Sequence, residues 1–582
     1  MKRLAYTIFC LFFSMAIFAV PARIAPFKLR LVDGSYVTAF LRGDEHFAWM
    51  QTTDGRLLEE TAEGYRLSDQ ALDDLLRQRV AQLESDARLQ TSRRRIGSQA
   101  TAPLPATGSP RVPVILVEFQ DSVFHVGNTP EEIRQYYDLY CNGTRDGNRY
   151  TAHNSYGAIR DYFVAQSEGQ FQPEFEIIGP VRLSQKEEHY GGNTGGPSTD
   201  KNYDGFVKEA VNLATQIYEG DWSDFCYRGS NSVSLVFFIY AGCGEANGGP
   251  SSTIWPKESV NSTSVKLDDE TVVSFSTSAC CNENRASLTD EAGNVLKSTP
   301  DGIGIMCHEL CHGLGLPDFY DYGNVGFGMD VWSVMDYGEY MGNGYNPVAL
   351  NAYERDFLGW RSLQTLDQPQ WLTLQPIDAG GYGYKIVNDE NPNEYYILES
   401  RQKAGWDSRL SNYGHGLQVT HVDYVSSSWN GNRVNSDANR QRCTIVAANN
   451  RYIGSTMLNN GQCTFDDMKK TWRGNLYPYR YTDGAGVEQC NDSLTAYSVP
   501  AATVYTAGKF LHKDIHAIRE NEDLSMTLYF GNDYVDAIKQ LPAAVRAQDD
   551  ALYDLSGRRL NGARLPKAGL YISRSGRKML IR

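Results

Sequence analysis

Apolar runs and amphipathic segments alternate along the chain between residues 111 and 315. The runs VPVILVEF (112–119) and SVSLVFFIYAG (232–242) are typical of buried strands. The segments GAIRDYFVAQ (157–166) and FVKEAVNLATQIY (206–218) instead carry apolar residues at helical spacing. This order of strand, helix, strand and helix predicts a layer of α/β structure.

The pattern changes after Trp360. The short aromatic and β-branched runs QWLTLQPI, EYYILES and GLQVTHVDY are separated by clusters of Gly, Asn and Asp. Strands bounded by such turn residues predict mainly antiparallel β structure, which we expect to end near residue 530.

Two further regions flank these parts of the chain. The N-terminal region has short alternating runs such as YVTAFLRG, a charged helical piece and then the basic, small-residue stretch QTSRRRIGSQATAPLPATGSP, which is typical of an exposed linker. The last residues predict three short strands in a small module. For a chain of 582 residues we therefore expect a multidomain α+β protein. After the first 22 residues, its expected parts are residues 23–105, 106–362, 363–532 and 545–582.

The first 22 residues indicate export. Lys2 and Arg3 precede an apolar run that ends in small residues, which is typical of a secretory signal peptide cleaved near Ala19 or Ala22. We therefore predict a secreted protein, extracellular or attached to the cell surface. A membrane anchor is the alternative, but the run is short for a full membrane span.

The amino-acid composition limits the kinds of molecule and ion that this chain is expected to bind. A net charge of −15 argues against binding of nucleic acid or anionic lipid over the whole surface. Acidic loops are compatible with calcium, although no Asp/Asn run has a complete calcium-loop spacing. Ten cysteines follow the signal peptide, an even number compatible with disulfides in an oxidising compartment.

Candidate chemistry is concentrated in CHELCHGLGLPD (307–318). Thr299 and Pro300 occupy positions where a helix would begin, and glycines follow where it would end. On such a helix His308 and His312 share a face and suit a tetrahedral zinc ion, while Glu309 can reach a water molecule on that ion.

A glycine then turns the chain so that Asp318 can approach as a third ligand. The alternative is a thermolysin-like arrangement, in which Glu354 from NAYERDFLGW completes the metal site. Both possibilities stay open on the sequence alone.

The motif resembles the metzincin pattern H-E-x-x-H-x-x-G-x-x-(H/D) with a downstream methionine, here Met335 in WSVMDYG. More closely, the chain is similar to the immune inhibitor A family of secreted bacterial metallopeptidases. The likeness extends to VEFQD, GAIRDYFVAQSEGQF, YAGCGEANGG, TIWP and RQKAGWDSRL.

This resemblance implies a metzincin-like zinc endopeptidase domain at 106–362, made with a propeptide at 23–105, that acts on proteins or peptides. His308, His312 and Asp318 would be its zinc ligands, and Glu309 its general base and acid. Tyr337 resembles the tyrosine that follows the methionine turn in astacins and serralysins, where it helps to hold the oxyanion; here it could instead simply pack.

The end of the chain carries a second resemblance. YDLSGRRL, KAGLYI and GRKMLIR are similar to the C-terminal sorting domains that direct Bacteroidetes proteins through type IX secretion, which implies contact with an outer-membrane secretion machinery. A small substrate-binding appendage is the alternative for this module.

A competing hypothesis for the whole protein is a secreted binding protein or adhesin with a structural metal site. The intact Glu309 argues against it, because a structural site has no need of a general base.

Overall fold

The computed structural model describes residues 17–534, apart from short gaps, and three short strands near the C-terminal end. The gaps are 23–25, 45–46, 62, 73, 79–96, 144–149, 194–199, 268–270, 290–294, 322–325, 454–464 and 507–508. The basic run at 93–95 lies outside the described residues.

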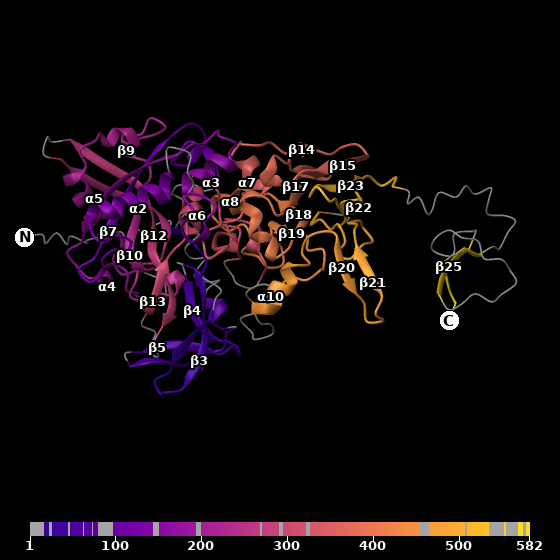
Figure 1. The fold of residues 1–582 in the computed structure, drawn as a ribbon, viewed down its shortest axis with the longest axis horizontal. Coiled ribbons are helices and arrows are strands. Elements are labelled where there is room, and N and C mark those ends of the chain that lie inside the picture. Colours follow the sequence, from indigo (N-terminus) through magenta and orange to yellow (C-terminus); the bar gives the residue numbers. More distant parts are fainter. Residues whose placement is uncertain are drawn as a thin grey trace, which may run out of the picture.

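A mixed sheet forms the N-terminal half of the molecule (Figure 1). Its strand order is β1-β11-β12-β10-β7-β8, with β9 and β13 also paired to β12. Strands β8, β7, β10 and β12 run parallel, whereas β11 and β1 are antiparallel additions at one edge. The strands are β1 (Ile17–Ala19), β7 (Arg111–Glu118), β8 (Glu174–Arg182), β9 (Ser232–Val233), β10 (Val236–Cys243), β11 (Lys257–Lys266), β12 (Val272–Thr289) and β13 (Val295–Pro300).

Helices cover both faces of this sheet. β7 shows why: Val112, Val114 and Leu116 belong to one hydrophobic cluster, and Ile115 and Val117 to another on the opposite face. A strand buried on both faces gives the continuous apolar run seen in the sequence. The helices are α2 (Pro130–Asn142), α3 (Ile159–Gln166) and α6 (Gly304–Gly313) on the first face, and α5 (Tyr203–Ile217) on the second; the short helix α4 (Glu187–Tyr190) lies beside α5.

The predicted antiparallel region is confirmed. One sheet has the order β14-β16-β17-β18-β19, a second β15-β23-β22, and β20 pairs with β21; among these described strands, β14 and β16 are the parallel pair. The strands are β14 (Gln364–Thr365), β15 (Gln370–Leu374), β16 (Tyr384–Asn388), β17 (Asn391–Arg401), β18 (Gly416–Asp423), β19 (Cys443–Ile445), β20 (Tyr479–Thr482), β21 (Glu488–Asn491), β22 (Ile515–Glu520) and β23 (Met526–Phe530). The helices here are α7 (Ala352–Phe357), α8 (Ser426–Asn430) and α10 (Phe465–Trp472).

Two small sheets lie at the ends of the chain. The first is a meander of β2 (Phe27–Arg30), β3 (Tyr36–Asp44), β4 (Phe47–Thr52), β5 (Leu57–Thr61) and β6 (Gly64–Leu67). The second is the predicted three-stranded module, β24 (Leu552–Tyr553), β25 (Gly569–Ser573) and β26 (Lys578–Ile581).

The largest hydrophobic cluster joins the α/β half to the β-rich half. It contains residues of α2, α3 and α6 together with Ile397, Trp406, Val422 and Trp429. The predicted boundaries between domains stay a prediction, but side chains from both sides of residue 362 pack into this cluster.

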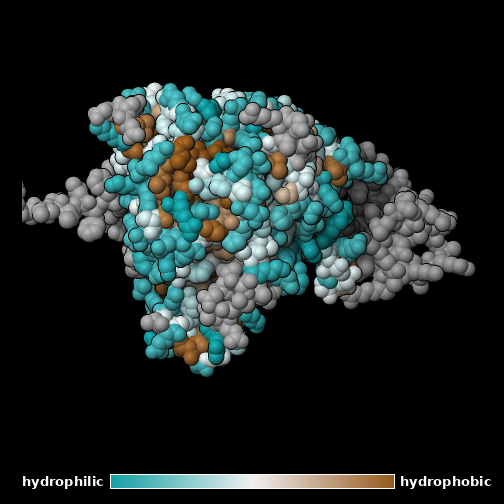
Figure 2. Space-filling view, turned by 60° about the vertical axis from the view of Figure 1, so that its left-hand side comes forward, coloured by the Kyte–Doolittle hydropathy of each residue, from teal (hydrophilic) through white to brown (hydrophobic). Residues whose placement is uncertain are grey.

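The molecular surface is largely hydrophilic in the view of Figure 2, with separate hydrophobic patches. Among the described residues, no helix has both the length and the apolar character needed to cross a membrane.

Candidate metal centre

Helix α6 carries both histidines of the motif, but it begins later than predicted. Thr299 and Pro300 belong to β13, where they pair with β12. The helix starts at Gly304, and Ile303 at its N-cap provides no side-chain hydrogen bond. The Gly304 N–H instead donates to the carbonyl of Gly344 at 2.9 Å, so a distant loop replaces the local cap.

The chain reverses directly after α6. Gly315 has φ +99°, a conformation that favours glycine, and Leu316 N–H donates back to Cys311 O at 3.0 Å. The next residues then pack against the predicted methionine turn, because Phe319 N–H donates to Met335 O at 2.9 Å. As expected from the sequence, this turn brings Asp318 over the helix.

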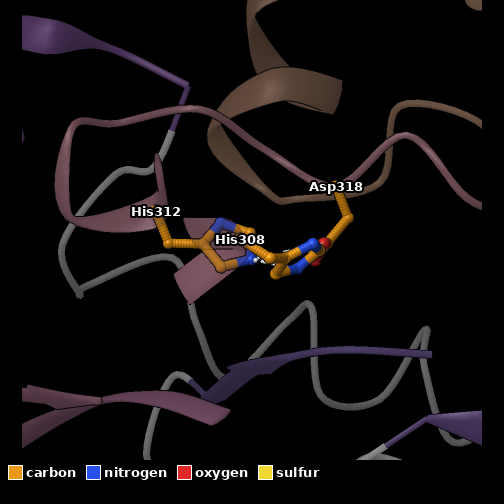
Figure 3. A group of neighbouring side chains, drawn as sticks. All are labelled: His308, His312 and Asp318. Atoms are coloured by element: carbon orange, nitrogen blue, oxygen red, sulfur yellow. Dashed lines mark hydrogen bonds and ion pairs between the residues drawn. The ribbon is translucent and has the colours of Figure 1, made fainter. Parts of the chain in front are cut away.

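Three side chains meet at one point (Figure 3). His308 Nε2 and His312 Nε2 lie 3.1 Å apart. Asp318 Oδ1 lies 3.1 Å from the first nitrogen and 3.2 Å from the second. All three side chains are fully buried. Within the described chain, this is the group of His, Cys, Asp and Glu residues with the geometry to hold a metal ion.

The hydrogen-bond partner of Nδ1 determines the tautomer of each histidine ring. His308 Nδ1 lies 2.8 Å from Val334 O, and His312 Nδ1 lies 2.8 Å from Leu316 O. A carbonyl oxygen only accepts, so each Nδ1 carries the hydrogen and each neutral ring presents an Nε2 lone pair. Two such lone pairs and a carboxylate oxygen converge, which is a donor set for a cation.

The spacing suits zinc in particular. In a tetrahedral site with zinc–nitrogen distances of about 2.0–2.1 Å, neighbouring ligand atoms lie about 3.3 Å apart. The separations of 3.1–3.2 Å among the three donor atoms are close to this value. The residues present therefore fit the ion.

The charges at the site are strongly coupled. Burial lowers the pKa of His308, although the Asp318 carboxylate opposes this effect. For His312 burial also lowers the pKa, but the carboxylate outweighs it and the net change is upward. Burial raises the pKa of Asp318, yet the charge and hydrogen bonds of the two imidazoles, in their protonated form without a metal ion, reverse this and hold the pKa below its usual range. Asp318 is thus held as the carboxylate, the form that binds metal.

The other predicted residues take different positions. Glu309 is fully buried on α6, next to His308 in the sequence. Tyr337 is partly buried and packs against the large cluster. Glu354 lies apart from the histidines: it accepts from Asn351 N–H in the capping box of α7 and from the Ser333 hydroxyl. Of the two candidates for third ligand, the structure brings Asp318 to the imidazoles.

Sequence reasoning missed two side chains beside the site. Asn432 donates from Nδ2 to Asp318 Oδ2 at 2.5 Å and accepts from Asp318 N–H at 2.7 Å. It lies 114 residues after Asp318, and no local pattern points to it. Glu339 is fully buried with Oε2 at 3.7 Å from His308 Nδ1, and burial followed by the Asp318 carboxylate raises its pKa. The sequence signal that could have pointed to Glu339 is its position four residues after Met335.

Cysteines do not enter the metal group. Cys307 and Cys311 are buried in the large cluster, as expected for the side of α6 away from the histidines. The nine cysteines in the described part of the chain are all free thiols. A calcium site stays a prediction.

Comparison with known proteins gives this geometry a family context. Residues 104–363 match the immune inhibitor A peptidase M6 catalytic domain. The pre-pro-metalloprotease PrtV from two strains of Vibrio cholerae serotype O1, M66-2 and ATCC 39315 / El Tor Inaba N16961, is 24% identical over 221 residues. The alignment covers 34% of this chain and 23% of each relative, so the chain spans under a quarter of their length. These matches support a metallopeptidase, with residues 104–363 similar to the immune inhibitor A catalytic domain.

Proposed function

We propose that the protein is a secreted zinc endopeptidase that hydrolyses peptide bonds in extracellular proteins. The observation that carries this proposal is the convergence of His308 Nε2, His312 Nε2 and Asp318 Oδ1 within a region that matches a peptidase domain. His308, His312 and Asp318 are the proposed zinc ligands. The metzincin-like class of the domain is part of the same proposal.

The carboxylate of Glu309 is the proposed general base and acid. A bound zinc ion would supply Lewis acidity, which lowers the pKa of a water ligand toward about 7 and polarises the peptide carbonyl. Glu309 accepts a proton from the attacking water and passes it to the leaving amine. Tyr337 is proposed to stabilise the developing oxyanion through its hydroxyl group.

The described chain is proposed to be an inactive precursor. His308, Glu309 and His312 are fully buried, so a protein substrate has no access to them in this form. Segments before residue 105 contribute to this cover: β1 contacts α6, and Gly97 N–H donates to Gly315 O at 2.8 Å. Removal of the leader at 1–22 and the propeptide at 23–105 would open the site. The pre-pro form named for the relative PrtV supports such processing.

Export and the final module belong to the same proposal. The N-terminal leader supports secretion, and the resemblance of residues 545–582 to sorting modules supports passage through an outer-membrane machinery. The three strands of this module pair only with one another in the described part of the chain, which suits a separate signal.

The test of function replaces Glu309 by glutamine in the processed protein. The amide keeps the size of the side chain but cannot accept the proton, so we expect casein cleavage to fall by at least ~10²-fold. Zinc content, measured by mass spectrometry, should stay at that of the unaltered protein because the ligands remain.

Glu488→Gln, at an exposed position of β21, is the matched control and should leave cleavage unchanged. Undiminished cleavage by the Glu309→Gln protein would overturn the proposed role of this residue.

A further inference from the structure

Asp318 is held by a segment that lies outside the matched peptidase region. Asn432 makes two hydrogen bonds to Asp318, one to the carboxylate Oδ2 and one from the backbone N–H. Oδ2 is the oxygen that does not face the imidazoles, since Oδ1 makes both histidine contacts. The amide therefore fixes the rotation of the carboxylate and aims Oδ1 at the two rings.

The position of Asn432 is itself well determined. It follows α8, whose Trp429 is fully buried in the large cluster, and its N–H donates to Trp429 O at 3.0 Å. Its φ of +51° lies in the left-handed region, which asparagine tolerates better than most residues. A buried anchor and a tight turn together hold the amide against Asp318.

A second asparagine secures the next residue of the same loop. Asn435 is fully buried and donates to Phe319 O at 2.6 Å and to Cys443 O at 2.7 Å. Its Oδ1 accepts from the backbone N–H of Cys443 at 3.0 Å. The loop that carries Asp318 is thus joined through amide side chains to β19 of the β-rich half.

We propose that Asn432 is a positioning residue for the metal site: by holding Asp318 it completes a three-ligand site that residues 104–363 alone leave loose. This inference rests on the proposed role of Asp318 as third ligand. Partners that orient a metal ligand typically contribute 10–100-fold to metal affinity.

The test compares two variants in the full chain. Asn432→Gly removes the amide without adding strain, because glycine adopts a positive φ freely. Asn432→Asp keeps the shape but places a carboxylate against Oδ2. Asn450→Gly is the matched control, since Asn450 has the same φ of +51° and an exposed side chain.

Zinc affinity is measured by competition with a chelator, and ligand geometry by the visible absorption of bound Co2+. We expect Asn432→Gly to weaken zinc binding by about 10–100-fold and to alter the Co2+ spectrum. Asn432→Asp should weaken binding at least as much, while Asn450→Gly changes neither measurement.

The two proposals fail differently. If the unaltered protein binds zinc and Asn432→Gly binds it equally tightly with the same Co2+ spectrum, the positioning role is overturned. If Asp318→Ala in the unaltered background leaves both measurements unchanged, the proposed ligand set is wrong instead.

Discussion

Glu354 is a fully buried carboxyl group whose protonation makes the folding stability depend on pH. Burial raises the pKa of Glu354 to about 7, although hydrogen bonds from Ser333 and Asn351 oppose this. The folded chain then keeps a proton that an unfolded glutamate releases near its usual value of 4.5. Folding stability from this residue is therefore present at low pH and is lost as pH rises toward about 7, by up to ~1.4 kcal/mol per pH unit.

Glu354→Gln should remove this dependence, because an amide resembles the protonated acid. We expect the melting temperature of the metal-free unaltered protein to fall relative to that of the variant as pH rises from 4.5 to about 7. Glu390→Gln at an exposed position should track the unaltered protein. A constant difference between the Glu354→Gln and unaltered proteins across this range would contradict the prediction.

The residues of the motif were predictable because their chemistry is local. His308 and His312 lie one helical turn apart, and Gly315 reverses the chain three residues after His312, so spacing predicted the shared face of the histidines and allowed Asp318 to approach, with Glu354 as the alternative. Asn432 was not predictable, since its contact with Asp318 depends on tertiary packing across 114 residues. Local patterns do not record such contacts.

The start of α6 depends on a close backbone approach. A Cβ added at Gly304 would lie 2.0 Å from the carbonyl oxygen of Glu339, in the short helix η7 (Tyr337–Tyr340), and 3.3 Å from Gly344 Cα. Both obstacles are backbone atoms, which cannot rotate away. The glycine therefore lets the loop that follows Met335 pack directly on α6, the helix that carries His308 and His312.

Gly304→Ala tests this packing, because helix propensity and the close backbone contact predict opposite changes in the free energy of unfolding. Alanine favours a helix by ~1 kcal/mol over glycine, so an isolated helix would become more stable. Here we expect a loss of about 1–3 kcal/mol in the free energy of unfolding, because the contact must widen. Denaturant unfolding measures this, and Gly484→Ala, where a Cβ meets nothing within 4 Å, is the control. A stability gain at Gly304 would refute the close-packing argument.

Strands and helices with strong periodicity were predicted well, whereas the beginning of α6 was not. β7 and β10 are continuous apolar runs, and α5 has apolar residues along one helical face. The hydrophobic pattern was therefore sufficient to predict these three elements. Thr299 and Pro300 have helix-start chemistry but pair with β12. Sheet pairing overrode the local preference there, as tertiary contacts commonly do.

The shared cluster makes the β-rich half part of the fold of the catalytic region. A chain ending at residue 363 lacks Ile397, Trp406, Val422 and Trp429, which are buried in the same hydrophobic cluster as residues of α3 and α6. We expect this truncated chain to lose cooperative thermal unfolding, measured by circular dichroism, because its core is left open to water. Normal cooperative unfolding would show that residues before 364 fold alone.

Deletion of residues 545–582 is the contrasting change. Because β24–β26 pair only with one another in the described chain, we expect the melting temperature to stay the same. Cell fractionation should find the shortened protein in the periplasm, as the sorting proposal requires. Its normal appearance outside the cell would count against that proposal.

The hydrogen bonds between Asp318 and Asn432 also determine when, during synthesis of the chain, the group of candidate ligands can be completed. Synthesis delivers the chain from its N-terminus, so His308, Glu309 and His312 emerge well before the Asn432 amide that holds Asp318. Until the chain has advanced a further 114 residues, the loop carrying Asp318 has no such support. A nascent chain therefore holds an incomplete group of candidate ligands until the segment that carries Asn432 has been made and has folded against Asp318.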